Sequence, residues 1–264
     1  MTLIIPSPYA GLVIPTVRAF HPKNLAQAVA VFDYTDPSIL FAETTGAAAS
    51  TPTTLNGMIG TAKDMTGKGG HQQAPGASNG PVLRQSGGRY YAEFNGSSQA
   101  LDIFNTSLLN VTADAFICAG YRWRSTVSGA RAAIGTNAGD RAIGHMRPTS
   151  STTNRAYVAT TVTATGANGS AISNGVDFVS DLDWTRSTGV FVNRINGATD
   201  ITINMTPANL NPPTVSYTLG TAGNSGAVCA PIDAYRMVYC SGTLTAGEKT
   251  AIRQWVADGS GVTL

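Results

Sequence analysis

The sequence predicts an all-β protein, a sandwich of short strands that ends in one helix. Only 12% of the 264 residues are charged and 29 are glycine, a composition that favours strands and tight turns over helices. Short apolar segments recur at intervals of roughly 8–12 residues with Gly, Asn or Pro between them, which is the spacing of a sandwich or jelly roll. One helix-capping motif occurs, and it lies near the end of the chain.

Residues 1–25 differ from the rest of the chain and predict an extended arm. Pro6, Pro8 and Pro15 interrupt its apolar stretch and oppose helix formation. Prolines also lower the entropic cost of ordering an extended strand on another subunit. We therefore divide the chain into an attachment arm, residues 1–25, and a sandwich domain, residues 26–264. The predicted assembly residues are the aliphatic ones of the arm: Leu3, Ile4, Ile5, Leu12, Val13 and Ile14.

The strands of the body can be assigned in chain order. Residues 29–33 alternate as a first strand. Residues 44–89 are rich in Gly, Thr, Ser and Pro, which predicts long loops that carry short strands. Residues 115–121 are apolar on both faces, as expected of a central strand covered on both sides. Further along, Asn196-Gly197 marks the turn of a hairpin.

The stretch "YYAEFNGSSQALDI", residues 90–103, predicts two strands joined by a corner. Ala92 and Phe94 share one face, Tyr91 and Glu93 share the other, and Asn-Gly supplies the turn between the strands.

The predicted helix begins at a capping box. The hydroxyl of Thr245 and the carboxylate of Glu248 are spaced to satisfy each other's free backbone donors. Ile252 and Trp255 then fall on one apolar face. We expect Trp255 to anchor the helix on the sandwich and Gly259 to end it.

Four segments together resemble the laminin-G-like, concanavalin A-like domains of many tailed-phage and prophage proteins. They are residues 31–46 (VFDYTDPSILFAETTG), 64–83 (DMTGKGGHQQAPGASNGPVL), 90–103 and 234–257 (AYRMVYCSGTLTAGEKTAIRQWVA). The second segment contains D-x-T-G-x-G-x-H. The third is similar to the family's aromatic-x-x-F-[DN]-G-x-x-x-x-L strand pair, with Asn95 where Asp is more common. The resemblance covers residues 29–258 and implies a concanavalin A-like jelly-roll sandwich.

The resemblance implies a non-enzymatic virion structural protein of a tailed phage or phage-like particle. It would be a head decoration, spike or fibre component whose lectin-like domain adheres to a host-surface glycan. Two alternatives stay open, because one sandwich fold serves many functions: a glycan-cleaving enzyme of the glucanase type, and a bacterial surface adhesion module. The expected partners are other virion proteins, bound through the arm, with a homo-oligomer and a cell-surface glycan as further options.

Charge and hydropathy argue against nucleic-acid and membrane partners. The formal net charge is only +2, and no apolar run is long enough to cross a bilayer. The start of the chain has no basic segment before its apolar stretch, so we expect synthesis in a host bacterial cytoplasm and a final place in the virion. The three sparse cysteines predict no disulfide framework and are expected to be buried small hydrophobes: Cys118, Cys229 and Cys240.

The carboxylates show no glucanase pattern. Glucanases of this fold carry E-x-D-x-x-E or E-x-D-x-E on one strand, and a retaining mechanism needs two carboxylates about 5–5.5 Å apart. The three glutamates, Glu43, Glu93 and Glu248, are isolated from one another. The nearest approach is Asp181 and Asp183, which share a strand face. Their simpler interpretation is a solvated strand edge, and a calcium site is the alternative. We expect no catalytic residue, metal or cofactor, with calcium as the one exception to test.

Two tryptophans are candidates for stacking on a sugar. Trp123 and Trp184 lie beside polar residues at expected strand ends. Core packing with a polar handle is the competing interpretation. Together with Asp181 and Asp183 they make up the ligand-binding candidates.

Basic residues give weaker signals. Arg122, Arg124 and Arg131 form a modest basic cluster that either contacts an anionic partner or solvates a strand. The histidines, His21, His71 and His145, lack metal-ligand spacing. We expect His71 to cap a loop.

Overall fold

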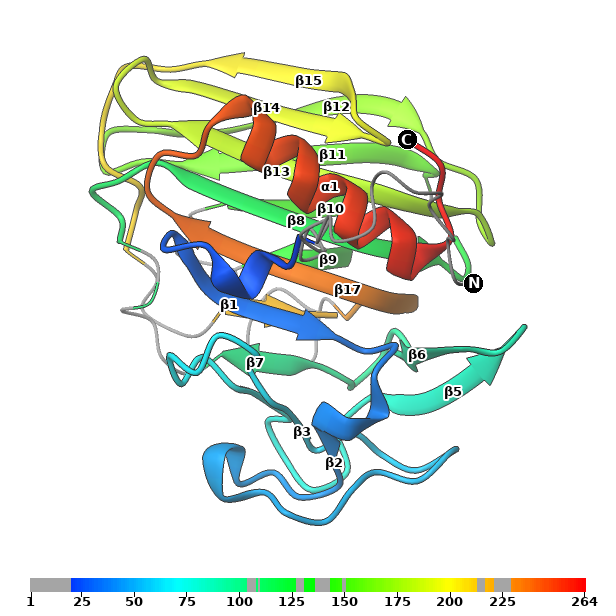
Figure 1. The fold of residues 1–264 in the computed structure, drawn as a ribbon. Helices are drawn as coiled ribbons and strands as arrows, with labels where there is room; N and C mark the ends of the chain where they lie inside the picture. Colours follow the sequence, from blue (N-terminus) through cyan, green and yellow to red (C-terminus); the bar gives the residue numbers. More distant parts are fainter. Residues whose placement is uncertain are drawn as a thin grey trace, which may run out of the picture.

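The computed structural model is a β-sandwich with one α-helix packed on its outside (Figure 1). It describes residues 20–103, 108, 110–126, 131–135, 143–148, 151–212, 217–220 and 229–264. Two large antiparallel sheets face each other, and α1 (Ala246–Ser260) is the only α-helix within these ranges. The predicted all-β fold class with a C-terminal helix is thereby confirmed. No helix in the described ranges is long and apolar enough to cross a membrane.

The first sheet has the order β15–β14–β13–β8–β17–β6–β5, and β1 also pairs with β17, farther along the strand than β6 does. All of its pairings are antiparallel. Its strands are β1 (Ala28–Asp33), β5 (Val82–Ser86), β6 (Arg89–Glu93), β8 (Ala115–Trp123), β13 (Asp177–Thr185), β14 (Val190–Ile195), β15 (Ala198–Asn204) and β17 (Ile232–Ser241).

The second sheet has the order β12–β11–β10–β9–β16–β7–β4–β3–β2. Its strands are β2 (Leu40–Phe41), β3 (Thr61–Ala62), β4 (Gln72–Gln73), β7 (Leu101–Ile103), β9 (Arg131–Gly135), β10 (Ile143–Arg147), β11 (Thr153–Ala159), β12 (Ala164–Ala171) and β16 (Tyr217–Leu219). Three short 3-10 helices complete the described elements: η1 (Pro22–Asn24), η2 (Pro37–Ile39) and η3 (Gly46–Ala48). The two-residue strands β2, β3 and β4 agree with the prediction of long loops carrying short strands.

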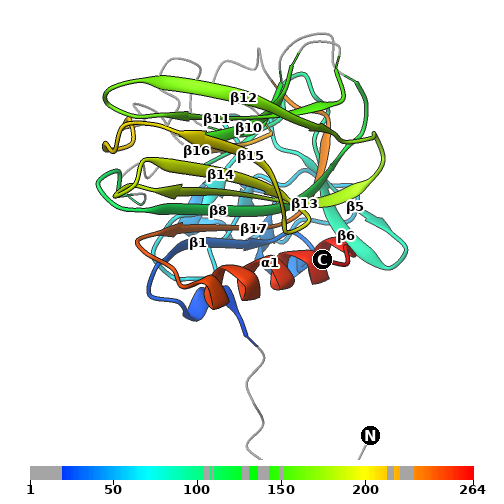
Figure 2. The same ribbon diagram turned by 90° about the horizontal axis from the view of Figure 1, so that it is seen from above.

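Strand β8 is buried on both faces, as its sequence predicts. Ile117 and Tyr121 point into the core between the two sheets. Phe116 and Cys118 point the other way, into a second apolar cluster under α1. The expectation for the cysteines is also confirmed, because all three are free and buried. Figure 2 shows α1 lying along the first sheet on the side away from the second.

The stretch 90–103 forms a corner between the two sheets. Its first strand, β6, belongs to the first sheet and its second, β7, to the second. Ala92 and Phe94 are fully buried while Tyr91 and Glu93 are half-buried, so the predicted alternation is confirmed. The side chain of Asn95 accepts hydrogen bonds from the Ser97 and Ser98 N–H groups at 2.9 and 3.1 Å. This Asx turn makes the bend.

Helix α1 begins as predicted and ends two residues later than predicted. The capping box between Thr245 and Glu248 is present. Gly259 lies inside the helix, where a Cβ would come within 2.3 Å of the Cδ of Arg236. The left-handed residue that ends the helix is Gly261, with φ of 70°. A close approach to the sheet therefore explains the first glycine, and backbone conformation explains the second.

The D-x-T-G-x-G-x-H segment is a structural loop. The Asp64 carboxylate accepts hydrogen bonds from the backbone N–H groups of Val31 and Thr66, both at 3.0 Å. His71 Nδ1 in turn accepts one from the Asp64 N–H at 3.0 Å. His71 thus caps the loop, as expected, and the Asp64 carboxylate ties the loop to β1. The other predicted turn is also confirmed: Asn196 and Gly197, with φ of 51° and 81°, join β14 to β15.

The predicted arm lies mostly outside the described residues, including Leu3, Ile4, Ile5, Leu12, Val13 and Ile14. Its described end is packed on the body. The ring centroids of His21 and Trp255 are 5.1 Å apart, and Pro22 is buried. Leu25 packs against the apolar cluster under α1. Residues 21–25 therefore pack on the sandwich, and the division into arm and sandwich domain stays a prediction.

Candidate functional site

The predicted carboxylates Asp181 and Asp183 are buried under helix α1, with exposed fractions of 0% and 7%. Asp181 accepts hydrogen bonds from Arg253 Nε at 2.6 Å and Arg194 Nη1 at 3.0 Å. Asp183 accepts one from Lys249 Nζ at 2.7 Å. Burial raises the pKa of Asp181, and the two guanidinium groups counteract that shift. The two aspartates are thus paired with cations and fasten α1 to β13; they do not form the solvated strand edge of the simpler interpretation.

Neither predicted tryptophan presents a face to solvent. Trp123 and Trp184 are both 0% exposed and lie in the core between the sheets. The guanidinium carbon of Arg147 lies 4.6 Å from the centre of a Trp123 ring. An enclosed indole offers no platform for a sugar, because stacking needs an accessible ring face. The structure therefore favours core packing for both residues.

The glutamates are held apart by local partners. Glu43 accepts hydrogen bonds from Thr51 in a loop after β2, and Glu248 caps α1. Glu93 lies opposite Asp233 in the register of β6 and β17, but Arg124 reaches both carboxylates, at 3.5 and 3.7 Å. In the part of the chain that the structure describes, no three His, Cys, Asp or Glu side chains converge as a metal site.

The predicted basic cluster is balanced by carboxylates. Arg122 Nε lies 2.6 Å from Asp233 Oδ2, and Arg124 is shared between Asp233 and Glu93. Arg131 is on β9 of the other sheet. Arg122 and Arg124 therefore link β8 to its neighbour β17 and to β6 in the first sheet.

A different set of residues gathers on the outer face of the second sheet, away from the core. Tyr157 on β11 lies flat across neighbouring strands because glycines face it. A Cβ at Gly144 would be 2.1 Å from the Tyr157 Oη, and one at Gly135 would be 2.5 Å from it. Met146 and Ala132 complete a small apolar cluster with the tyrosine. Glycine opposite an aromatic residue is a known means of fixing cross-strand register.

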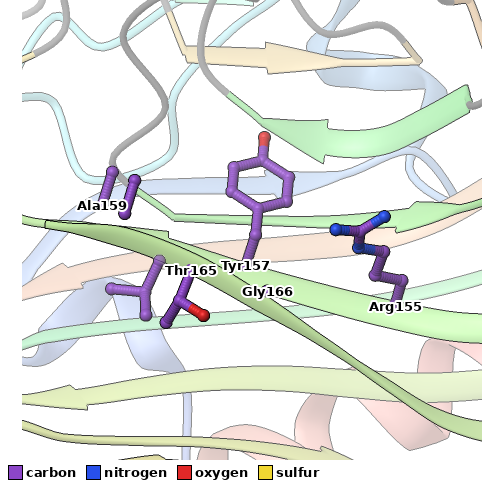
Figure 3. Close-up of a pocket in the computed structure, with 7 residues that line it drawn as sticks. Arg155, Tyr157, Ala159, Thr165 and Gly166 are labelled. Atoms are coloured by element: carbon purple, nitrogen blue, oxygen red, sulfur yellow. The ribbon is translucent and has the colours of Figure 1, made fainter. Parts of the chain in front are cut away.

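A pocket of about 200 Å³ opens beside this tyrosine (Figure 3). Arg155 and Tyr157 rise from β11 on the same side, since residues i and i+2 of a strand share a face. Figure 3 shows the Tyr157 ring between the Arg155 side chain on one side and Ala159 on the other. Gly166 keeps the floor low, because a Cβ there would lie 3.3 Å from Arg155 Nε.

Arg155 is the charged group of this pocket. Its side chain is exposed, and among the described residues it has no hydrogen bond or ion pair. Tyr157 is only 5% exposed, so it contributes the edge of its ring to the pocket wall. The arrangement can hold a small polar ring and direct guanidinium donors at its oxygen atoms.

Sequence reasoning did not single out this pocket. The segment "RAYVATTVTA" (155–164) was identifiable as a strand, and its alternation places Arg155 and Tyr157 on one face. What makes the face distinctive is the pairing of Tyr157 with Gly144 on β10 and Gly166 on β12. That pairing depends on strand register, which a single sequence does not reveal.

The comparisons with known proteins concern the fold. No model of a protein family matches the chain, and no curated protein is similar to it in sequence. Among solved structures, a Trypanosoma rangeli sialidase in complex with the inhibitor DANA is similar with a TM-score of 0.61 and 11% identity, over 87% of this chain and 33% of the sialidase. The binding domain of Paraclostridial Mosquitocidal Protein 1 gives 0.58 and 9%, over 75% and 49%. The binding domain of Botulinum neurotoxin serotype G gives 0.58 and 8%, over 86% and 51%.

These likenesses show the fold, a β-sandwich. The chain spans about a third of the length of the sialidase and about half that of each toxin binding domain.

Proposed function

We propose that this chain is a non-enzymatic, lectin-like display domain that binds a glycan in the Arg155–Tyr157 pocket. One observation carries the proposal: an exposed arginine, which has no hydrogen bond or ion pair among the described residues, shares a hollow with an aromatic ring on a sheet face of the sandwich. The similar solved structures fit this role, since one is a sialidase bound to an inhibitor and two are toxin binding domains.

The size and chemistry of the pocket suit a short stretch of sugar. Its volume of about 200 Å³ lies below the roughly 300–1,000 Å³ of pockets that take drug-sized ligands. A guanidinium that is free to donate several hydrogen bonds favours a ligand rich in oxygen atoms. We therefore expect one or two sugar units to enter the pocket and the rest of the glycan to lie outside.

The non-enzymatic part rests on the carboxylates. In most families of glycosidases, hydrolysis uses two carboxyl groups that flank the bond, and sialidases, which use a tyrosine nucleophile, are an exception. Among the described residues that line the Arg155–Tyr157 pocket there is neither a carboxylate nor a histidine. The buried pair Asp181 and Asp183, which lies elsewhere, is neutralised by three cations under α1.

We further propose that the domain belongs to the surface of a tailed-phage or phage-like particle, to which residues 1–20 attach it. The support is the sequence resemblance together with the apolar, proline-rich composition of that segment. The described root of the arm, His21 to Leu25, packs on α1. The pocket lies on the opposite sheet, so attachment at α1 would leave it facing outward.

Glycan binding can be tested with a matched pair of arginine variants. Arg155→Ala removes the guanidinium of the pocket, whereas Arg186→Ala removes an exposed guanidinium whose Nε donates a hydrogen bond to Asn209. A glycan array would identify the ligand, and calorimetry would give its affinity. We expect Arg155→Ala to weaken binding about tenfold or more, the worth of a hydrogen bond to a charged group. Equal affinities for the two variants, or no ligand on a broad array, would refute the pocket.

Two further measurements test the rest of the proposal. No glycan that binds should be hydrolysed, and turnover by the purified chain would make it an enzyme. Deletion of residues 1–20 should abolish incorporation into particles while the thermal stability of the body is kept. Normal incorporation of the truncated chain would contradict the attachment role.

A further inference from the structure

On one side of the molecule, both sheets end in strands whose outer edges are open. These strands are β12 and β15, and we call residues 164–171 and 198–204 the open flank (Figure 1). The two strands are linked at one point, where the Asp200 carboxylate accepts a 2.8 Å hydrogen bond from the Ser170 N–H.

The opposite edges are covered by the chain itself. At β5, Leu83 exchanges hydrogen bonds with Asn56 and Gly57, at 2.8 and 2.9 Å. At β2, Thr51 and Thr53 bond to the neighbouring backbone, each at 2.9 Å. Within the described ranges, no backbone hydrogen bond joins the outer edge of β12 or β15 to another segment. Of the strands that end the two sheet orders in the described structure, those of the open flank therefore present the long rows of backbone groups for pairing.

The open flank also lacks the usual protection against pairing. Edge strands are normally shielded by charged side chains, by proline or by short length. Here every exposed side chain is Ala, Thr, Asn or Ser, and there is no proline. The one charged residue, Asp200, turns inward, since its other carboxylate oxygen accepts a 2.7 Å hydrogen bond from Asn154. The charge that a partner strand would meet is this half-buried carboxylate, which is already hydrogen-bonded to Ser170 and Asn154.

We infer that the open flank binds a second copy of this chain about a two-fold axis, edge to edge. In such an interface each surface meets itself, so any exposed charge near the axis would face its own copy. A flank without exposed charge satisfies this condition. Two identical strands related by a two-fold axis run antiparallel, which matches every pairing already present in both sheets.

The interface should be small and the dimer weak. Strands of 8 and 7 residues extend for about 26 and 23 Å at 3.3 Å per residue. Sheets in a sandwich are about 10 Å apart, so the flank falls at the small end of specific interfaces. We therefore expect a concentration-dependent dimer. It would continue the second sheet across the axis and place two Arg155–Tyr157 pockets on one face, although the inference does not depend on what they bind.

The experiment is sedimentation equilibrium of the full chain and of lysine variants on and off the flank. The range from about 1 µM to about 1 mM covers the affinities expected of small interfaces. Asn168→Lys on β12 and Thr202→Lys on β15 place charges on exposed positions of the flank. Thr250→Lys, on the exposed side of α1, is the matched control. Hydrogen exchange at both ends of the concentration range reports which backbone amides the association protects.

The expected result is a dimer that the flank variants weaken at least tenfold and Thr250→Lys leaves unchanged. Protection at high concentration should rise in residues 164–171 and 198–204. A chain that stays monomeric to about 1 mM overturns the inference. A dimer insensitive to the flank variants, or protected elsewhere, overturns it equally.

Discussion

Asp102 on β7 and His145 on β10 are both completely buried, and they lie on opposite faces of the same sheet. In the described structure neither side chain has a hydrogen-bond partner. Burial raises the pKa of Asp102 to about 7 and lowers the pKa of His145 to about 3, because the buried site disfavours the charged form of each. The two groups are therefore neutral over much of the same pH range, because the same burial shifts their pKa values in opposite directions.

These two groups predict that single variants of Asp102 and His145 should change the pH dependence of the unfolding free energy in opposite directions. Unfolded His titrates near 6.5 and unfolded Asp near 3.9. Between about pH 3 and 6.5 the unfolded state binds a proton at His145 that the folded state excludes, so this group makes stability rise with pH. Between about pH 4 and 7 the folded state keeps a proton on Asp102 that the unfolded state loses, so this group makes stability fall with pH. The overlapping effects should largely cancel in the natural chain.

Urea unfolding at a series of pH values would separate the two effects. Relative to the natural chain, His145→Phe should lose stability as pH rises from about 4 to 6.5, and Asp102→Asn should gain it, each by up to about 1.4 kcal/mol per pH unit. Other titrating groups cancel in these differences. Parallel profiles for all three proteins would show that the two groups are not buried and neutral as described. His145→Phe should cost little at neutral pH, because an apolar ring replaces a ring with two unsatisfied nitrogens.

The ion pairs under α1 give a second prediction. Asp181→Asn leaves Arg253 and Arg194 facing an uncharged group in a buried layer. Loss of one partner of a buried pair costs about 3–5 kcal/mol, and we expect the lower end because Arg253 is 12% exposed. The control is Asp258→Asn on the exposed side of the same helix, which should change stability by less than about 0.5 kcal/mol. Chemical denaturation checks both, and equal effects would mean that Asp181 does not fasten the helix.

The glycine under the tyrosine gives a third prediction. Gly144→Ala places a Cβ 2.1 Å from the Tyr157 Oη, so the ring must move, at a cost of about 1–3 kcal/mol. Gly247→Ala in the first turn of α1 meets no close neighbour and should stabilise the protein by up to about 1 kcal/mol. In a Tyr157→Ala background the penalty of Gly144→Ala should largely disappear. An undiminished penalty there would show that the clash lies elsewhere.

Sequence patterns predicted the elements of this fold better than the site. The capping box at Thr245, the Asn196-Gly197 turn and the two-faced strand β8 are local features, set by hydrogen bonds and burial within a few residues. Each appeared in the structure where the sequence placed it. The end of α1 was misplaced because Gly259 is needed for close contact with Arg236, which is 23 positions away in the sequence, and not for ending the helix.

The predicted ligand-binding residues turned out to be buried, for a related reason. Trp123 and Asp181 stood out by residue type, but whether a tryptophan faces solvent or an aspartate meets a cation depends on which strand or helix covers it. Arg155 and Tyr157 were unremarkable by type. They became a pocket only when strand register set glycines at 144 and 166 beside them. Register and layer packing are long-range properties, and the alternation of side chains along one strand does not determine them.

Trp255 gives the last prediction, because its indole is clamped between two cationic or ionisable side chains. The His21 ring lies 5.1 Å from it and the Arg236 guanidinium carbon 4.4 Å, while the residue is 8% exposed. Trp255→Ala should destabilise the protein by about 3–5 kcal/mol, the usual cost of emptying a large aromatic site. The neighbouring Gln254→Ala, on the exposed side of α1, should cost less than about 0.5 kcal/mol.

Because His21 loses its ring partner, limited proteolysis near residues 21–25 should accelerate in Trp255→Ala before the body unfolds. A loss below about 1 kcal/mol, with unchanged proteolysis, would mean that neither the helix nor the root of the arm depends on this indole.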